Sequence, residues 1–156
     1  MTLQRTLAHI DYRDAFHAEL QWAPCDAEEF FRRFRESSPG WARVAARIRD
    51  ALVAPLHLHA THRSSRRLEA RSESLEFGQR LGPFVVIEVT AHEVTVGDDD
   101  RHLRFRFRCS LDGPQLVTAT TEVEYQNTLG RFYFAMVKPF HWLIVKRTLA
   151  RAASRE

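Results

Sequence analysis

The chain of 156 residues has little cysteine, little lysine and no long apolar run. Cys25 and Cys109 stand apart without CxxC spacing, so we expect two free thiols in a reducing compartment rather than a disulfide. The first 13 residues lack the apolar core that secretion needs, and no uncharged segment is long enough to span a bilayer. These absences predict a cytoplasmic protein without a transmembrane segment.

Lysine occurs only at Lys138 and Lys146, and arginine supplies the other basic residues. The formal net charge is +3, with carboxylates interspersed. Because no recognised binding motif accompanies this mild excess, we expect no nucleic-acid partner. No Gly-rich phosphate loop, GxSxG elbow or Cys/His pair at useful spacing is found, which argues against nucleotide enzymes and hydrolases.

Hydrophobic residues make up 44% of the chain, which is enough to bury one sizeable core. We expect a lead-in over residues 1–11 and a single domain over residues 12–153. Period-two alternation is clearest from Arg101 to Cys109, typical of a strand with one face on a core and the other in water. Further strands are expected at residues 12–20, 75–77, 83–90, 93–97 and 116–125.

The alternation predicts one apolar and one basic face. Leu103, Phe105, Phe107 and Cys109 share the inner face with alternate residues from Val117 to Tyr125. With a three-residue loop at 112–114, Arg104 would lie opposite Glu122, and His102 opposite Glu124. The basic residues would then form a charge-paired solvent face, with an anion-binding strip as the alternative.

Three helices are expected. Asp26-Ala-Glu-Glu29 resembles a capping box and begins a short helix whose buried stripe contains Phe30, Phe31 and Phe34. Ser38-Pro39 opens a second helix with Trp41, Val44, Ile48 and Leu52 at helical spacing, ended by Pro55. Residues 56–74 carry no clear signal. Asn127 is a good N-cap for a final helix from Thr128 to about Ala153, which Pro139 should kink.

The final helix has two apolar surfaces. At about 100° per residue, a wide face is predicted to cover the sheet, formed by Leu129, Phe132, Tyr133, Met136, Phe140, Leu143 and Ile144, with Arg147 at its lower end. Phe134, Trp142 and Val145 project elsewhere, and such a patch suggests a homodimer seam or peripheral membrane contact, unless the kink buries Trp142.

Several segments carry a family resemblance. They are Pro39-Gly-Trp-Ala-Arg-Val, Ile48-Arg-Asp-Ala-Leu-Val53, Gly97-Asp-Asp-Asp-Arg-His-Leu-Arg-Phe-Arg106, Thr120-Thr-Glu-Val123, Asn127-Thr-Leu-Gly-Arg-Phe-Tyr133 and Pro139-Phe-His-Trp-Leu-Ile-Val145. Over residues 14–152 the chain resembles the bacterial domain of unknown function 2867 family. The order of elements is similar to the START-like, polyketide-cyclase-like helix-grip fold. Asp50 and Arg104 depart from the Asn and Asp expected there.

The resemblance implies an α+β fold in which a curved antiparallel sheet wraps around the C-terminal helix, leaving a cavity. Aromatic residues between helix and sheet either fill a core or line a pocket for a small apolar guest. The candidate ligand-binding residues are Phe84, Phe105, Phe107, Tyr125, Phe132, Tyr133, Met136, Phe140 and Arg147.

Chemistry beyond binding has weaker support. His141 and Tyr133 are the candidate acid/base residues, although the sequence identifies no titrating partner. His57, His59 and His62 are favoured as surface-loop residues, and Asp98 to Asp100 as a turn, so we expect no metal and no cofactor. The leading hypothesis is a binding protein for a small hydrophobic or amphipathic molecule. The alternatives are a cyclase, lyase or isomerase and a homodimerising interaction module.

Overall fold

The computed structural model describes residues 3–40, 43, 47 and 74–154. The fold class is α+β, as predicted. The described elements in chain order are β1 (Tyr12–Glu19), α1 (Ala27–Glu36), β2 (Arg80–Leu81), β3 (Phe84–Val89), β4 (Glu93–Asp99), β5 (Leu103–Leu111), β6 (Leu116–Tyr125) and α3 (Thr128–Ala153). Residues 75–77 are not a strand, so that prediction is wrong; the short strand lies at β2 instead. The helix stripe from Trp41 to Leu52 and the histidines at 57, 59 and 62 lie outside the described residues.

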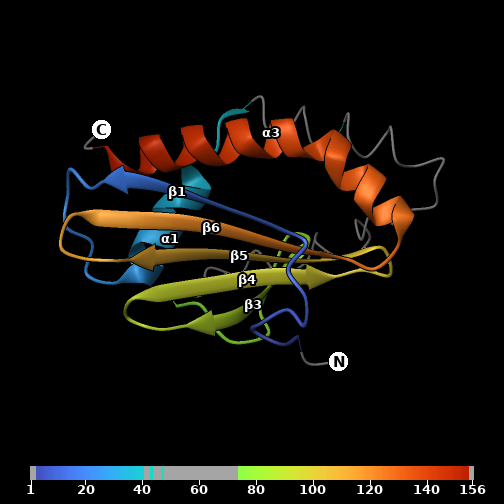
Figure 1. Ribbon diagram of the computed structural model, residues 1–156. Helices are drawn as coiled ribbons and strands as arrows, with labels where there is room; N and C mark the ends of the chain where they lie inside the picture. The colour runs from blue at the N-terminus through green and yellow to red at the C-terminus, as the bar shows by residue number, and fades with distance from the viewer. Residues whose placement is uncertain (1–2, 41–42, 44–46, 48–73, 155–156) are drawn as a thin grey trace.

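The six described strands form one antiparallel, curved sheet in the order β1-β6-β5-β4-β3-β2. Both described helices cover its inner face: α1 contacts β4 and β5, α3 contacts β1 and β6, and the helices contact each other (Figure 1). Directly paired residues share a face of a sheet. One inner row therefore runs from Asp14 through Thr121, Phe107 and Val96 to Val86.

Two of the three predicted helix starts, at Asp26 and Asn127, are confirmed. The Asp26 carboxylate accepts a hydrogen bond from the Glu29 N–H at 2.8 Å, and the Asn127 side chain accepts one from the Gly130 N–H at 2.9 Å. Each cap satisfies a backbone donor that the first turn of a helix leaves free. Pro139 lies inside α3, where it can donate no backbone hydrogen bond, and Figure 1 shows the helix bending towards its N-terminal end.

The face that α3 turns towards the sheet is only partly the predicted one: Ile144 points inward as expected, but most of the other residues do not. Phe134 and Val145, expected to point outward, are buried, with Phe134 only 4% exposed. Phe132, Met136, Phe140 and Leu143, expected to face the sheet, are exposed, with Phe132 at 64%. One physical reason is steric. A Cβ at Gly130 would clash with the His102 carbonyl group, so only a glycine lets this side of the first turn approach the sheet so closely.

The outer face of the sheet pairs its charges, as predicted, but in a different register. The connection between β5 and β6 is longer than three residues, so Arg104 lies opposite Glu124 and Arg106 opposite Glu122. Arg104 approaches Glu124 at 3.8 Å, and Arg108 approaches Glu93 at 3.2 Å.

The N-terminal segment lies across this outer face rather than hanging free. Arg5 pairs with Glu88 at 2.7 Å and with Glu93 at 3.0 Å. The Gln4 carbonyl accepts a hydrogen bond from Arg106 Nε at 2.7 Å. Arg106 is consequently only 2% exposed, although it belongs to the face predicted to meet water.

Candidate functional site

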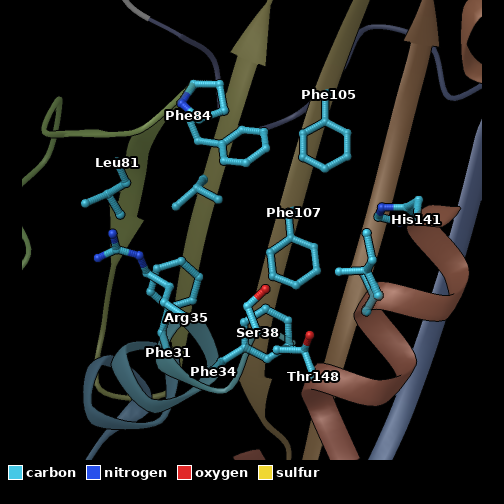
Figure 2. A pocket seen from close by; sticks show the side chains of 14 residues that line it. Phe31, Phe34, Arg35, Ser38, Leu81, Phe84, Phe105, Phe107, His141 and Thr148 are labelled. Atoms are coloured by element: carbon cyan, nitrogen blue, oxygen red, sulfur yellow. The ribbon is translucent and has the colours of Figure 1, made fainter. Parts of the chain in front are cut away.

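A pocket of about 340 Å³ opens between α1, α3 and the inner face of the sheet (Figure 2). Ligand pockets in proteins begin at about 300 Å³, so this space suits a small organic molecule. Its floor comes from the sheet and its two walls from the helices. The lining residues are Phe31, Phe34, Arg35, Ser38, Leu81, Pro83, Phe84, Val96, Phe105, Phe107, His141, Ile144, Val145 and Thr148.

Aromatic rings from three elements define the apolar part of the pocket. Phe84 of β3 and Phe105 of β5 stack on the inner face of the sheet, with ring centroids 5.4 Å apart. Phe34 of α1 lies 5.3 Å from Phe107. The imidazole of His141 meets Phe105 edge-on at 6.1 Å. The wall is therefore mainly hydrocarbon, with a histidine at one edge.

His141 is anchored from behind by the sheet. Its Nε2 lies 2.9 Å from Thr121 Oγ1 and 3.6 Å from Asp14 Oδ2, and both His141 and Asp14 are largely buried. Asp14 and Thr121 are paired neighbours on β1 and β6, so the sheet register brings them together beneath α3. A carboxylate and a hydroxyl on one ring nitrogen fix the orientation of an imidazole and direct its other nitrogen elsewhere.

The charge of Asp14 is supported by its neighbours. Burial raises the pKa of this carboxyl, but hydrogen bonds from His141 and Tyr12 outweigh burial, and the net pKa lies below its ordinary value. The Tyr12 hydroxyl donates to Asp14 Oδ2 at 2.6 Å. Burial, reinforced by Asp14, raises the pKa of Tyr12 to about 12. Trp142 Nε1 donates to the Tyr12 hydroxyl oxygen at 3.0 Å and extends this network towards the surface.

The structure brings only part of the predicted site together. Phe84, Phe105, Phe107 and His141 line the pocket. Tyr125 packs on Phe134 instead, at 6.0 Å, with the Arg131 guanidinium over its ring. The remaining predicted ligand-binding residues are absent from the lining because of the rotation of α3, namely Phe132, Tyr133, Met136, Phe140 and Arg147.

The sequence interpretation missed one wall of the pocket and the partner of His141. Phe31 and Phe34 were predicted only as the buried stripe of α1, since nothing local shows which strand a short helix will cover. Asp14 did carry a signal. It falls between Tyr12 and Phe16 on the inner face of β1, and a carboxylate on a core face requires a partner.

The other predicted sites have structural explanations. Among the residues that the structure describes, no cluster of His, Cys, Asp or Glu could hold a metal ion. Asp98 and Asp99 belong to β4 rather than to the turn, and Asp99 pairs with Arg106 at 2.6 Å.

Of the three residues proposed for a homodimer seam, Trp142 alone is exposed, so the prediction that Phe134 and Val145 form such a surface is wrong. Within the described ranges no helix has both the length and the apolar run needed to cross a bilayer.

Comparison with known proteins gives one match. The family model described as "Protein of unknown function (DUF2867)" covers residues 6–148. The chain belongs to this family. No curated protein and no solved structure matches the chain. The matched region includes the whole sheet and both pocket walls, so the pocket lies inside the family's own domain.

Proposed function

We propose that this protein binds a small hydrophobic or amphipathic molecule between the sheet and α3, in the manner of a helix-grip domain. The observation that carries the proposal is the aromatic-lined space of about 340 Å³ beside an oriented histidine. An apolar pocket with few polar groups is the usual form of a small-molecule site. Burying an apolar guest there would contribute roughly 25 cal/mol for each Å² removed from water.

A pair of neighbouring substitutions on α3 tests this proposal. Ile144 lines the pocket, whereas Leu143 is exposed on the outside of the helix. N-phenyl-1-naphthylamine, whose fluorescence rises in apolar surroundings, should bind the unmodified protein. Ile144→Trp should weaken this binding at least tenfold by filling the pocket, while Leu143→Trp should leave it unchanged. Equal binding by both variants, or no binding by the unmodified protein, would contradict the proposal.

A second candidate function, proton-transfer catalysis in the same pocket, is favoured by the contact between His141 and Asp14. A histidine held by a buried carboxylate is a common arrangement for a general base, provided that substrate can reach its free nitrogen. Tyr133 does not line the pocket, which leaves His141 as the acid/base residue of this candidate. The reaction class would be the one expected from the sequence, a cyclase, lyase or isomerase.

The ring opening of 5-nitrobenzisoxazole provides a generic assay for such a base. A base removes the C3 proton, the C–H electrons form the nitrile, and the N–O bond breaks to give 2-cyano-4-nitrophenolate. The protein should accelerate this reaction beyond an equal concentration of free imidazole, and His141→Gln should remove the acceleration. His102→Gln is the matched control, since His102 is absent from the lining and lies near Asn127. A rate no greater than that with imidazole would exclude this candidate.

A further inference from the structure

The pocket contains a buried hydroxyl without a partner. Thr148 is 1% exposed, lines the pocket, and its Oγ1 accepts or donates no hydrogen bond among the described residues. A threonine inside a helix commonly bonds the carbonyl oxygen four residues back, and here that bond is not made. Figure 2 shows the hydroxyl on the pocket side of α3. Buried polar groups are nearly always paired, so an unpaired one that faces a cavity indicates a bound polar atom.

His141 offers a second polar atom to the same space. Its Nε2 is engaged by Thr121 at 2.9 Å and lies 3.6 Å from Asp14, so Nδ1 is the ring nitrogen that a ligand would use. A neutral imidazole nitrogen accepts a proton from an acidic hydroxyl, and a protonated one donates to the resulting oxyanion. Either protonation state therefore pairs with the same ligand group, a weakly acidic O–H. If the ligand's proton passes to His141, the Asp14 carboxylate beside Nε2 balances the positive charge of the ring, so no isolated charge is buried.

The spacing of these two groups limits the shape of the ligand. Residues 141 and 148 are seven positions apart on α3, which corresponds to about two turns and roughly 10 Å along the axis. Ile144 and Val145 lie between them on the same wall, so the intervening surface is apolar. A compact polar headgroup cannot reach both atoms, whereas a chain or ring system with an oxygen near each end can.

Building on the proposed binding function, we propose that the ligand is a weak organic acid with a second oxygen function at the far end of an apolar body. Its carboxylic acid or phenol pairs with His141 Nδ1, and its distal hydroxyl or carbonyl satisfies the Thr148 hydroxyl. Phe105 and Phe107 contact the body between them. His141 and Thr148 are the residues that determine ligand specificity, and the aromatic floor supplies most of the burial.

Three related compounds test this assignment on the full-length protein, by displacement of N-phenyl-1-naphthylamine: octanoic acid, its methyl ester and 8-hydroxyoctanoic acid. A charge-assisted hydrogen bond favours the acid over the ester by about tenfold or more, and a neutral one favours the hydroxy acid over octanoic acid by about fivefold. His141→Phe should abolish the first preference and Thr148→Val the second. His141→Gln serves as a second variant in case removal of the ring impairs folding.

The outcomes separate this assignment from the function on which it rests. If the probe binds but the unmodified protein treats acid and ester alike, the acid assignment is overturned while the binding function stands. If Thr148→Val keeps the advantage of the hydroxy acid, the role of Thr148 is overturned. If the probe itself does not bind, the binding function fails. Preserved thermal stability of Thr148→Val would confirm that any loss of affinity comes from the hydroxyl.

Discussion

Arg106 illustrates how a charged residue becomes part of an interior. Its guanidinium reaches Asp99 at 2.6 Å, the Phe105 carbonyl at 2.8 Å and the Gln4 carbonyl at 2.7 Å. Gly97 makes room for it, since a Cβ there would lie 2.9 Å from Arg106 Cδ. The alternation pattern places Arg106 on the outer face correctly, but it contains no information about the segment that covers it.

Arg106→Met should therefore destabilise the protein by roughly 3–5 kcal/mol, because it leaves a largely buried carboxylate and two carbonyls without their donor. Arg104→Met is the matched control on the same strand. The Arg104 side chain is 36% exposed and meets its partners at 3.8–4.0 Å, so its loss should cost less than about 1 kcal/mol. Urea unfolding of the two variants measures the difference, and equal losses would contradict the distinction.

Asp14 should make stability depend on pH in a definite direction. Its pKa in the folded protein lies below the ordinary value of 3.8, so the unfolded chain binds a proton first as the solution is acidified. The carboxylate thus contributes stability above about pH 4, and this contribution is lost as the pH falls through the folded-state pKa. The free-energy difference between the unmodified protein and Asp14→Asn should shrink between pH 6 and about pH 3.

Asp98 provides a control of opposite sign. Burial, with Asp100 nearby, raises the pKa of the Asp98 carboxyl above its ordinary value. Ionised Asp98 therefore opposes folding at neutral pH. Asp98→Asn should gain stability relative to the unmodified protein as the pH rises from the ordinary carboxyl pKa of 3.8 through the higher pKa of the folded protein. Chemical unfolding at several pH values distinguishes the two slopes. Parallel pH profiles for both variants would show that neither carboxyl is linked to folding in this way.

At the scale of elements, the contact between Gly130 and His102 determines how closely the first turn of α3 approaches the sheet. Gly130→Ala would place a methyl group against the His102 carbonyl, so the N-terminal turn of α3 must shift. Forced repacking of this kind costs roughly 1–3 kcal/mol, and the helix propensity of alanine offsets less than about 1 kcal/mol of it. Gly113→Ala is the control, because nothing lies within 4 Å of its added Cβ. Thermal unfolding should show a loss only for the first variant.

The same helix shows what local sequence can and cannot predict. Its ends at Thr128 and Ala153 follow from the Asn127 cap and the run of helix-forming residues, and they were predicted correctly. Which of its faces meets the sheet depends on tertiary contacts, such as the one between Gly130 and His102, which lies 28 residues earlier in the chain. Counting apolar side chains favours the face around Phe132. In the structure the face that contains Gly130 and Phe134 packs against the sheet instead. The composition of α3 is apolar on nearly all sides, so periodicity alone could not choose.

In the candidate site, too, local patterns predicted some residues, whereas tertiary contacts determined the others. Phe105 and Phe107 were predicted because strand alternation is local and strict. Phe31 and Asp14 enter the site through α1 and β1, whose positions over the sheet are fixed only by tertiary contacts. His141 was identified by its chemistry, but its partner depends on the pairing of β1 with β6, which a pattern of alternation does not reveal.

At the scale of the whole molecule, the N-terminal segment crosses four neighbouring strands of the sheet and contacts each of them. Residues 4 and 5 contact β3, β4 and β5, and Asp11 bonds the backbone of Val123 and Tyr125. A variant that lacks residues 1–9 should lose roughly 1–3 kcal/mol, because Arg106 loses a buried acceptor. Arg5→Ala should cost less than about 1 kcal/mol, since its ion pairs are half-exposed. A truncated protein as stable as the full chain would contradict this role.

The two free thiols give a direct readout of the integrity of the core. Cys109 is buried on the inner face of β5, and burial strongly raises the pKa of its thiol. Cys25 is exposed, although the nearby Glu29 carboxylate raises its pKa as well. Alkylation with iodoacetamide followed by mass spectrometry should add one label to the native protein and a second only when the sheet separates from its helices. The rate of that second addition would report how often the molecule opens, without a fluorescent probe, a ligand or any substitution.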